Sequence, residues 1–328
     1  MLKPFLTESH SVPVFEGDRS RRHRDVPLWR LAARGAIGAV RRGRRFGSVS
    51  TFVQFVGFPR SGHSLIGSIL DAHPQAVVSH ELDTMGLLKK GLPEKVVYAL
   101  IEENSATFSR HGRYWNGFSY AVPGGHHGPT EPLRVIGDKK GDWAVRWCGK
   151  DPDLIEAVGR KVHARCRWIL VTRHPLDNIA TMSLRKNRTY DRLRIEAADS
   201  TDFKARLAAS QERGEVAAAA LDDMIDDYEG LCQTIERMQA ATPADDWCHV
   251  EYERFSVHPA DEIRRLARFL DLEPDTDYVA SSASIVRDSP NKSRNAVTWT
   301  DQQLERVEAL SRHFSFLHSY DSAPRPHA

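Results

Sequence analysis

The sequence has 328 residues, of which 41% are hydrophobic and 27% charged, and a formal net charge of only +2. These values are typical of a globular protein with one large or two small domains, and they argue against a polyelectrolyte that binds nucleic acid. We find no apolar run of about 18 residues and no signal-peptide core. The four cysteines form no C-x-x-C pair, so we expect a cytoplasmic protein without a zinc site or disulfide scaffold.

Arginine is concentrated near the N-terminus, where residues 19–45 contain ten arginines and one acid. The stretch VPLWRLAARGAIGAVRRGRR (26–45) is compatible with a short basic amphipathic helix that rests weakly on an anionic membrane surface. The alternative is a solvated, partly disordered lead-in. We therefore divide the chain into a basic N-terminal extension, residues 1–48, and one domain, residues 49–328.

The first predicted strand is the apolar run TFVQFVG (51–57), and a helix with apolar residues at helical spacing follows at 63–73. Four further strands are predicted, together with two amphipathic helices and a long helical region. The strands are 76–79, 133–137, 167–172 and 247–252, the helices are 175–186 and 259–272, and the helical region is 201–241. This alternation predicts an α/β fold, a P-loop-like three-layer sandwich with a central, mostly parallel sheet and helices on both faces.

Residues 104–132 differ from the rest because glycine, histidine and aromatic residues occur there without periodicity. We interpret this stretch as a long surface loop that forms a lid over an acceptor site. It contains His111, His126 and His127. No carboxylate or cysteine stands at metal-ligand spacing from them, so we do not predict a metal site there.

The loop between the first strand and helix, VGFPRSGHSLI (56–66), is an incomplete match to G-x-x-x-x-G-K-[ST]. Gly57, Gly62 and Ser64 fit, but His63 stands where that motif has its phosphate-binding lysine. A kinase-type loop also needs an acidic second ligand for magnesium, and Asp138 is a poor candidate because Arg134 and Gly137 interrupt its strand.

Without the lysine, the loop still has the features of an anion site. The backbone N–H groups from Ser61 to Leu65 and the helix dipole point at one spot. Glycine at position 62 allows close approach of the anion, and Arg60 adds a cation. We expect the loop to hold a less charged group than a triphosphate, such as one 5′-phosphate, without a metal.

A second anion-binding position is predicted where the strand 167–172 ends. Arg173 follows that strand directly, and Thr181 lies eight residues later in the next helix. Ligands of open α/β sheets bind at this edge, outside the carboxyl ends of the strands. We expect the guanidinium and the hydroxyl to meet on one phosphate.

Three blocks of the sequence together resemble the sulfotransferases that use 3′-phosphoadenosine 5′-phosphosulfate (PAPS). GFPRSGHSLI…LDAHP is similar to the family's 5′-phosphosulfate loop, with His63 in place of the usual threonine. LVTRHPLDNIATMS is similar to its 3′-phosphate motif, with Thr181 in place of the serine. VEYERFSVHPADEIRRLARFLDL is similar to the strand and helix whose tyrosine, here Tyr252, lies by the adenine. The resemblance is closest to the bacterial and protein-tyrosine sulfotransferase branch.

The resemblance implies transfer of a sulfuryl group from PAPS, as cosubstrate, to a hydroxyl or amine, without a metal. Glu81 is then the catalytic base, with His80 as the competing candidate. Arg60 and a lysine stabilise the leaving group, and the lysine candidates in order are Lys139, Lys140 and Lys150.

A block near the C-terminus, SPNKSRNAVTW (289–299), resembles the basic loop that closes over the donor. On that resemblance, Lys292, Ser293 and Arg294 lie on the 3′-phosphate side. The acceptor stays open between a carbohydrate, a lipid or other small metabolite, and a peptide tyrosine. Two alternatives stand beside this function: a P-loop kinase or NTPase with a displaced lysine, and a non-catalytic nucleotide-binding protein of the same fold.

Overall fold

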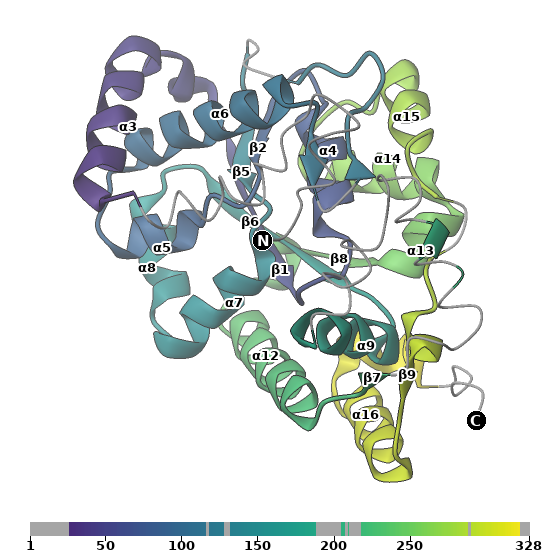
Figure 1. Ribbon diagram of the computed structural model, residues 1–328. Helices are drawn as coiled ribbons and strands as arrows, with labels where there is room; N and C mark the ends of the chain where they lie inside the picture. Colours follow the sequence, from purple (N-terminus) through teal and green to yellow (C-terminus); the bar gives the residue numbers. More distant parts are fainter. Residues whose placement is uncertain are drawn as a thin grey trace, which may run out of the picture.

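The protein is represented by a computed structural model that describes residues 26–115, 118–127, 132–187, 205–206, 209, 218–287 and 290–321. A five-stranded parallel sheet forms its centre, in the order β2-β5-β1-β6-β8 (Figure 1). The strands are β1 (Thr51–Gly57), β2 (Ala76–Ser79), β5 (Val135–Asp138), β6 (Arg165–Thr172) and β8 (Trp247–Glu251). Because the chain leaves central β1 toward β2 and later crosses to β6, the strand order switches at β1, where open α/β sheets bind ligands.

Helices cover both faces of the sheet, as alternate apolar residues of β1 require. Phe52 and Val56 point into one buried cluster, while Val53 and Phe55 point into another. The helices of the first face are α5 (Thr84–Lys89), α6 (Glu94–Arg110), α7 (Gly141–Lys150), α8 (Leu154–Lys161), α9 (Pro175–Lys186), α12 (Asp222–Ala240) and α16 (Asp301–His313). Those of the second face are α4 (His63–Asp71), α13 (Tyr252–Val257), α14 (Pro259–Phe269) and α15 (Thr276–Ala283). The predicted three-layer P-loop-like α/β fold is therefore confirmed.

Most predicted elements agree with the structure to within three residues. The strands 51–57 and 76–79 and the helix 175–186 have the predicted bounds. The strand predicted at 247–252 ends one residue earlier, because Tyr252 begins α13. Within the predicted helical region 201–241, the structure has α12 at Asp222–Ala240, and most of residues 188–217 lie outside the described residues.

The prediction of a loop over 104–132 is wrong for its first part. Helix α6 continues to Arg110 with Asn104, Ser105 and Phe108 buried. The two polar side chains can be buried because each forms a hydrogen bond inside the protein. Asn104 accepts the His80 backbone N–H, and Ser105 donates to Asp71. Two short antiparallel strands follow, β3 (Tyr114–Trp115) and β4 (Phe118–Ser119). Residues 116–117 and 128–131 lie outside the described residues.

The basic segment before β1 forms a helix, α3 (Leu28–Arg42), which packs against α6 (Figure 1). A Cβ added to Gly35 would lie 2.6 Å from Val96 Cγ1, and one added to Gly38 would lie 2.8 Å from Ala99 Cβ. The two glycines thus let the helices approach closely, so the lead-in interpretation is wrong for this part. Residues 1–25 lie outside the described residues, and the division at residue 48 stays a prediction.

The remaining short elements are β7 (Ala218–Ala219), paired with β9 (Val297–Thr298), and four 3-10 turns. The turns are η1 (Arg45–Ser48), η2 (Ala244–Asp246), η3 (Ser293–Ala296) and η4 (Ser315–Tyr320). The four cysteines are free. In the segments that the structure describes, each helix is too short or too polar to cross a bilayer.

Candidate active site

The loop between β1 and α4 has a backbone that its sequence only partly favours. Gly62 has φ +106° and lies against Tyr252, whose ring would be 2.4 Å from an added Cβ. Arg60 adopts φ +72° although it carries a side chain. Non-glycine residues in this left-handed region are uncommon and gather at functional sites. Tyr252 therefore lies beside the loop, and its place next to the adenine stays a prediction.

Within this loop, backbone N–H groups are available as donors to a ligand. Ser61 is buried and donates its hydroxyl to Phe58 O at 2.9 Å. The Leu65 N–H donates to Gly62 O at 3.1 Å. Among the described residues no acceptor takes the N–H of Gly62, His63 or Ser64. These three donors at the start of α4 are available to an anion, as at other helix N-termini.

His63, the residue that replaces the usual threonine, is used inside the fold. Its Nε2 lies 3.1 Å from Val56 O, and its ring meets Phe55 edge-on. On the other side, a Cβ added to Gly141 would lie 2.6 Å from the ring. Burial lowers the pKa of His63 to about 4, so the ring is neutral and donates Nε2–H to Val56 O. His63 braces the loop against β1 and α7 and offers a ligand its backbone N–H.

Beside the loop, the predicted base and both leading lysine candidates meet. Glu81 follows β2, Lys139 follows β5, and the two strands are paired in register at Ser79 and Asp138. Glu81 forms ion pairs with both Lys139 and Lys140. Lys139 Nζ also donates to Ser64 Oγ at 2.9 Å, which joins this cluster to the anion loop. Burial lowers the pKa of Lys139 to about 7.

The turn that carries Glu81 is held by Asp138, a residue that sequence reasoning considered only as a poor metal ligand. Glu81 has φ +61°, so its backbone is also left-handed. Asp138 is fully buried and accepts hydrogen bonds from Ser79 Oγ at 3.0 Å, Asp83 N at 2.9 Å and Thr84 N at 3.1 Å. Because both carboxylate oxygens are engaged, Asp138 positions Glu81 and does not fit a magnesium ligand.

The competing candidates are placed differently. His80 is buried, with its ring stacked on Phe108 at 3.9 Å and edge-on to Trp115 at 4.7 Å between centroids. Burial holds the pKa of His80 well below its ordinary value. Lys150 is exposed at the far end of α7 from Gly141, about 13 Å along a helix that rises 1.5 Å per residue. The structure does not bring Lys150 into the Glu81 cluster.

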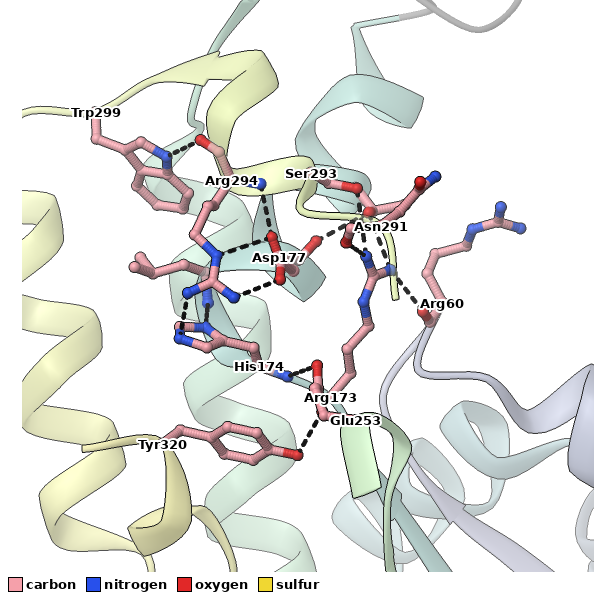
Figure 2. A network of polar contacts seen from close by, with 12 residues as sticks. Arg60, Arg173, His174, Asp177, Glu253, Asn291, Ser293, Arg294, Trp299 and Tyr320 are labelled. Atoms are coloured by element: carbon pink, nitrogen blue, oxygen red, sulfur yellow. Dashed lines mark hydrogen bonds and ion pairs between the residues drawn. The ribbon is translucent and has the colours of Figure 1, made fainter. Parts of the chain in front are cut away.

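The second anion position assembles at the end of β6 (Figure 2). Arg173 Nη1 lies 3.5 Å from Thr181 Oγ1 and 3.5 Å from Arg60 O. Its Nη2 lies 3.4 Å from Ser293 Oγ and also donates to Asn291 O. These contacts bring together the predicted arginine, threonine and closing-loop serine, and they link the second position to the anion loop.

The Arg294 guanidinium is not directed at this cluster. Figure 2 shows the Arg294 guanidinium facing Asp177 and His174, on the opposite side of Asp177 from Arg173. Arg294 Nη2 lies 2.7 Å from Asp177 Oδ2, and its backbone N–H donates to Oδ1 at 2.8 Å. Lys292 is exposed. Arg294 thus fastens the closing loop to α9, and its assignment to the donor phosphate stays a prediction.

Sequence reasoning missed the residues that support the second position from behind. Glu253 accepts the His174 backbone N–H at 3.0 Å and the Tyr320 hydroxyl at 3.0 Å (Figure 2). Asp177, in the first turn of α9, could have been noticed as an acid between Arg173 and Thr181. For Tyr320, near the C-terminus, the sequence offered no signal.

A central parallel sheet with the β1–α4 loop after one strand and the Arg173 guanidinium after the neighbouring strand defines a P-loop-like α/β protein. The sequence profile of the family described as "Sulfotransferase family" matches residues 53–277. This match covers more than half of the chain, and the chain belongs to the sulfotransferase family. The predicted resemblance to sulfotransferases is thereby confirmed.

Individual relatives are distant. Protein-tyrosine sulfotransferase A of Caenorhabditis elegans is 23% identical over 257 residues, which are 77% of this chain but only 58% of the relative. Among solved structures, sulfotransferase STF9 from Mycobacterium avium has a TM-score of 0.46 at 13% identity, covering 90% of this chain and 83% of that one. The sulfotransferase domain of the Synechococcus PCC 7002 olefin synthase has a TM-score of 0.43 at 12% identity, covering 82% and 95%.

Proposed function

We propose that the protein transfers the sulfuryl group of PAPS to a hydroxyl or amine of an acceptor, with Glu81 as general base. One observation carries this proposal: a series of contacts joins the base to both anion positions. Glu81 pairs with Lys139, and Lys139 contacts Ser64 in the loop. Arg60 O in the same loop contacts Arg173 (Figure 2).

The described residues fit the two ends of this donor. The N–H groups of Gly62, His63 and Ser64 suit the 5′-phosphosulfate end. Arg173, Thr181 and Ser293 suit the 3′-phosphate. Arg173 Nε is buried without a hydrogen-bond partner, and in the described part of the chain no carboxylate forms an ion pair with this arginine. Its positive charge is therefore available to an anion.

In the proposed reaction the acceptor oxygen or nitrogen forms a bond to sulfur as the bond from sulfur to the phosphate oxygen breaks. Glu81 takes the acceptor proton. The leaving oxygen carries away the electron pair of the broken bond, and Lys139 and Arg60 stabilise its negative charge. Lys139 is the first choice because its Nζ donates to Ser64 Oγ in the loop. Lys140 is the second choice because it pairs with Glu81.

Binding experiments on the full chain separate this proposal from its alternatives. We expect 3′,5′-ADP, the desulfated product, to bind more tightly than ATP with magnesium in isothermal titration calorimetry. The reverse order would favour a kinase or NTPase. Binding of 3′,5′-ADP without transfer of label from PAPS to any acceptor would indicate a non-catalytic nucleotide-binding protein.

The acceptor is found by incubating the protein and labelled PAPS with an extract of the source organism and identifying the labelled product. Defined candidates for the same assay are tyrosine peptides, sugars and lipid hydroxyls. Tyrosine peptides are included because the curated relative is a protein-tyrosine sulfotransferase. We expect transfer to be unchanged when EDTA removes divalent metal.

A further inference from the structure

Helix α3 (Leu28–Arg42) concentrates the exposed apolar surface of the protein. Of the five exposed large hydrophobic residues among the described ones, four belong to this helix: Leu28, Trp29, Ile37 and Val40. Trp29 is 67% and Val40 87% exposed. At 3.6 residues per turn, Trp29, Ile37 and Val40 fall on one stripe along the helix. An apolar stripe of this kind is unusual on a surface without a binding partner.

The stripe stays exposed because the opposite face of α3 is fixed to the protein. Leu31, Gly35 and Gly38 are buried there, and the two glycines lie against α6 (Figure 1). Arg42 and Arg45 form ion pairs with the buried carboxylate of Glu102, at 3.3 and 3.6 Å. A roll of the helix that buried Trp29 would break these contacts. The stripe is therefore a permanent feature of the surface.

Arginines flank the stripe. Arg30, Arg41 and Arg44 are exposed, and no acid of the described residues forms an ion pair with them. By contrast, Arg34, like Arg42 and Arg45, is engaged with a glutamate of α6. Arg30 instead lies over the Trp29 ring, 5.1 Å from its centroid. The exposed face thus combines apolar residues with cations that no described acid neutralises. This combination is typical of helices that lie in the interface of an anionic bilayer.

We propose that α3 docks the protein on an anionic membrane surface. In the docked state the Trp29, Ile37 and Val40 side chains enter the acyl boundary, and Arg30, Arg41 and Arg44 contact lipid phosphates. A second copy of the chain would place like-charged arginines against each other, and a nucleic acid offers phosphates but no apolar phase for the stripe. This inference does not depend on the proposed reaction.

Vesicle binding by the full chain tests the proposal. We expect sedimentation with vesicles that contain about a third anionic phosphatidylserine and not with neutral phosphatidylcholine vesicles, and we expect binding to weaken as salt increases. Trp29 is the only exposed one of the seven tryptophans. On binding, its fluorescence should shift to the blue and lose sensitivity to an aqueous quencher. Trp29→Ser should remove both changes.

Variants separate the apolar and charged contributions. The double variant Ile37→Ser/Val40→Ser should weaken binding about tenfold or more, and each of Arg30→Gln, Arg41→Gln and Arg44→Gln about fivefold. The matched control is Val257→Ser, because Val257 is 60% exposed but lies away from α3. Unchanged 3′,5′-ADP binding, or unchanged thermal unfolding if the nucleotide does not bind, shows that each variant is folded. The proposal would be overturned if the wild-type protein did not bind anionic vesicles, or if the α3 variants bound them as tightly as Val257→Ser does.

Discussion

The two ends of the candidate donor site differ in the charge of the groups that contact their key side chains. At the transfer end, Glu81 forms ion pairs with Lys139 and Lys140, so opposite charges lie in contact. At the other end, the partners of Arg173 are uncharged oxygens of the main chain and of hydroxyls, and the acid nearby, Asp177, is paired with Arg294 (Figure 2). One end is suited to groups that exchange a proton and stabilise new charge. The other is suited to hold a fixed anion throughout the reaction.

Glu81→Gln should have the largest effect on turnover, because it keeps the shape of the side chain and removes its basicity. If Glu81 is the general base, turnover should fall about 10²- to 10⁴-fold. Binding of 3′,5′-ADP should stay within a few-fold, because the anion positions remain intact. Single-turnover transfer from labelled PAPS measures the first quantity, and calorimetry the second.

Glu273→Gln is the matched control, since Glu273 is exposed and far from the loop in sequence. If Glu81→Gln turned over about as fast as the wild type, another residue would have to be the general base. His80 would then be tested next, because its ring borders the same turn.

The two lysines should differ although both pair with Glu81. Lys139 is buried and contacts Ser64, so Lys139→Met should lower turnover about 100-fold. Lys140 pairs with Glu81, and Lys140→Met should have a smaller effect on turnover, about tenfold. Lys150→Met, from the distant end of α7, serves as the control with unchanged turnover. Equal losses in the first two variants would show that the contact with Ser64 does not select the leaving-group cation.

At the other end, Arg173→Ala should act on binding rather than on chemistry. We expect the Kd for 3′,5′-ADP to rise about 10- to 100-fold, as for the loss of a charge-assisted hydrogen bond to phosphate. Binding of 5′-ADP, which lacks the 3′-phosphate, should change little. Calorimetry with the two nucleotides gives the comparison within one variant, and an equal loss for both would assign Arg173 a general structural role.

The pH dependence follows from Lys139, whose pKa burial lowers to about 7. If the protonated form assists the leaving group, kcat/KM should fall as pH rises above about 7, up to tenfold per unit. Lys139→Arg stays charged and should lose this alkaline limb. The unfolded chain binds this proton up to about pH 10, so the free energy of unfolding should rise between pH 7 and pH 10. Lys139→Met should remove that rise, and profiles identical to the wild type would contradict the assignment.

The sequence predicted the features that depend on short-range patterns. The apolar runs identified the five strands of the sheet, and the eight-residue spacing placed Thr181 against Arg173, where the structure has them in contact. Parallel strands end at one edge, so residues that follow β2 and β5 had to come close, as Glu81 and Lys139 do. In these cases one local rule per element was enough.

The features that were missed depend on contacts between distant parts of the chain. Nothing near Arg294 indicates that it pairs with Asp177, which lies 117 residues earlier. The backbone turn that carries Glu81 depends on hydrogen bonds to Asp138, which lies more than 50 residues later, and no spacing rule describes it. Helix α6 continues through Asn104 and Ser105 because both side chains form hydrogen bonds with buried partners, His80 N and Asp71. Propensity and periodicity cannot report such partners in advance.

The smallest effect on activity is expected at the anion loop itself, for His63→Thr, which introduces the family's usual residue. The backbone N–H groups remain, so 3′,5′-ADP binding should weaken at most a few-fold. The cost should appear in stability instead, about 1–3 kcal/mol, because the hydrogen bond to Val56 O and the packing on Phe55 and Gly141 are lost. Chemical denaturation measures it, with the exposed His126→Thr as control. A large loss of nucleotide binding at full stability would instead make the His63 ring a direct ligand of the donor.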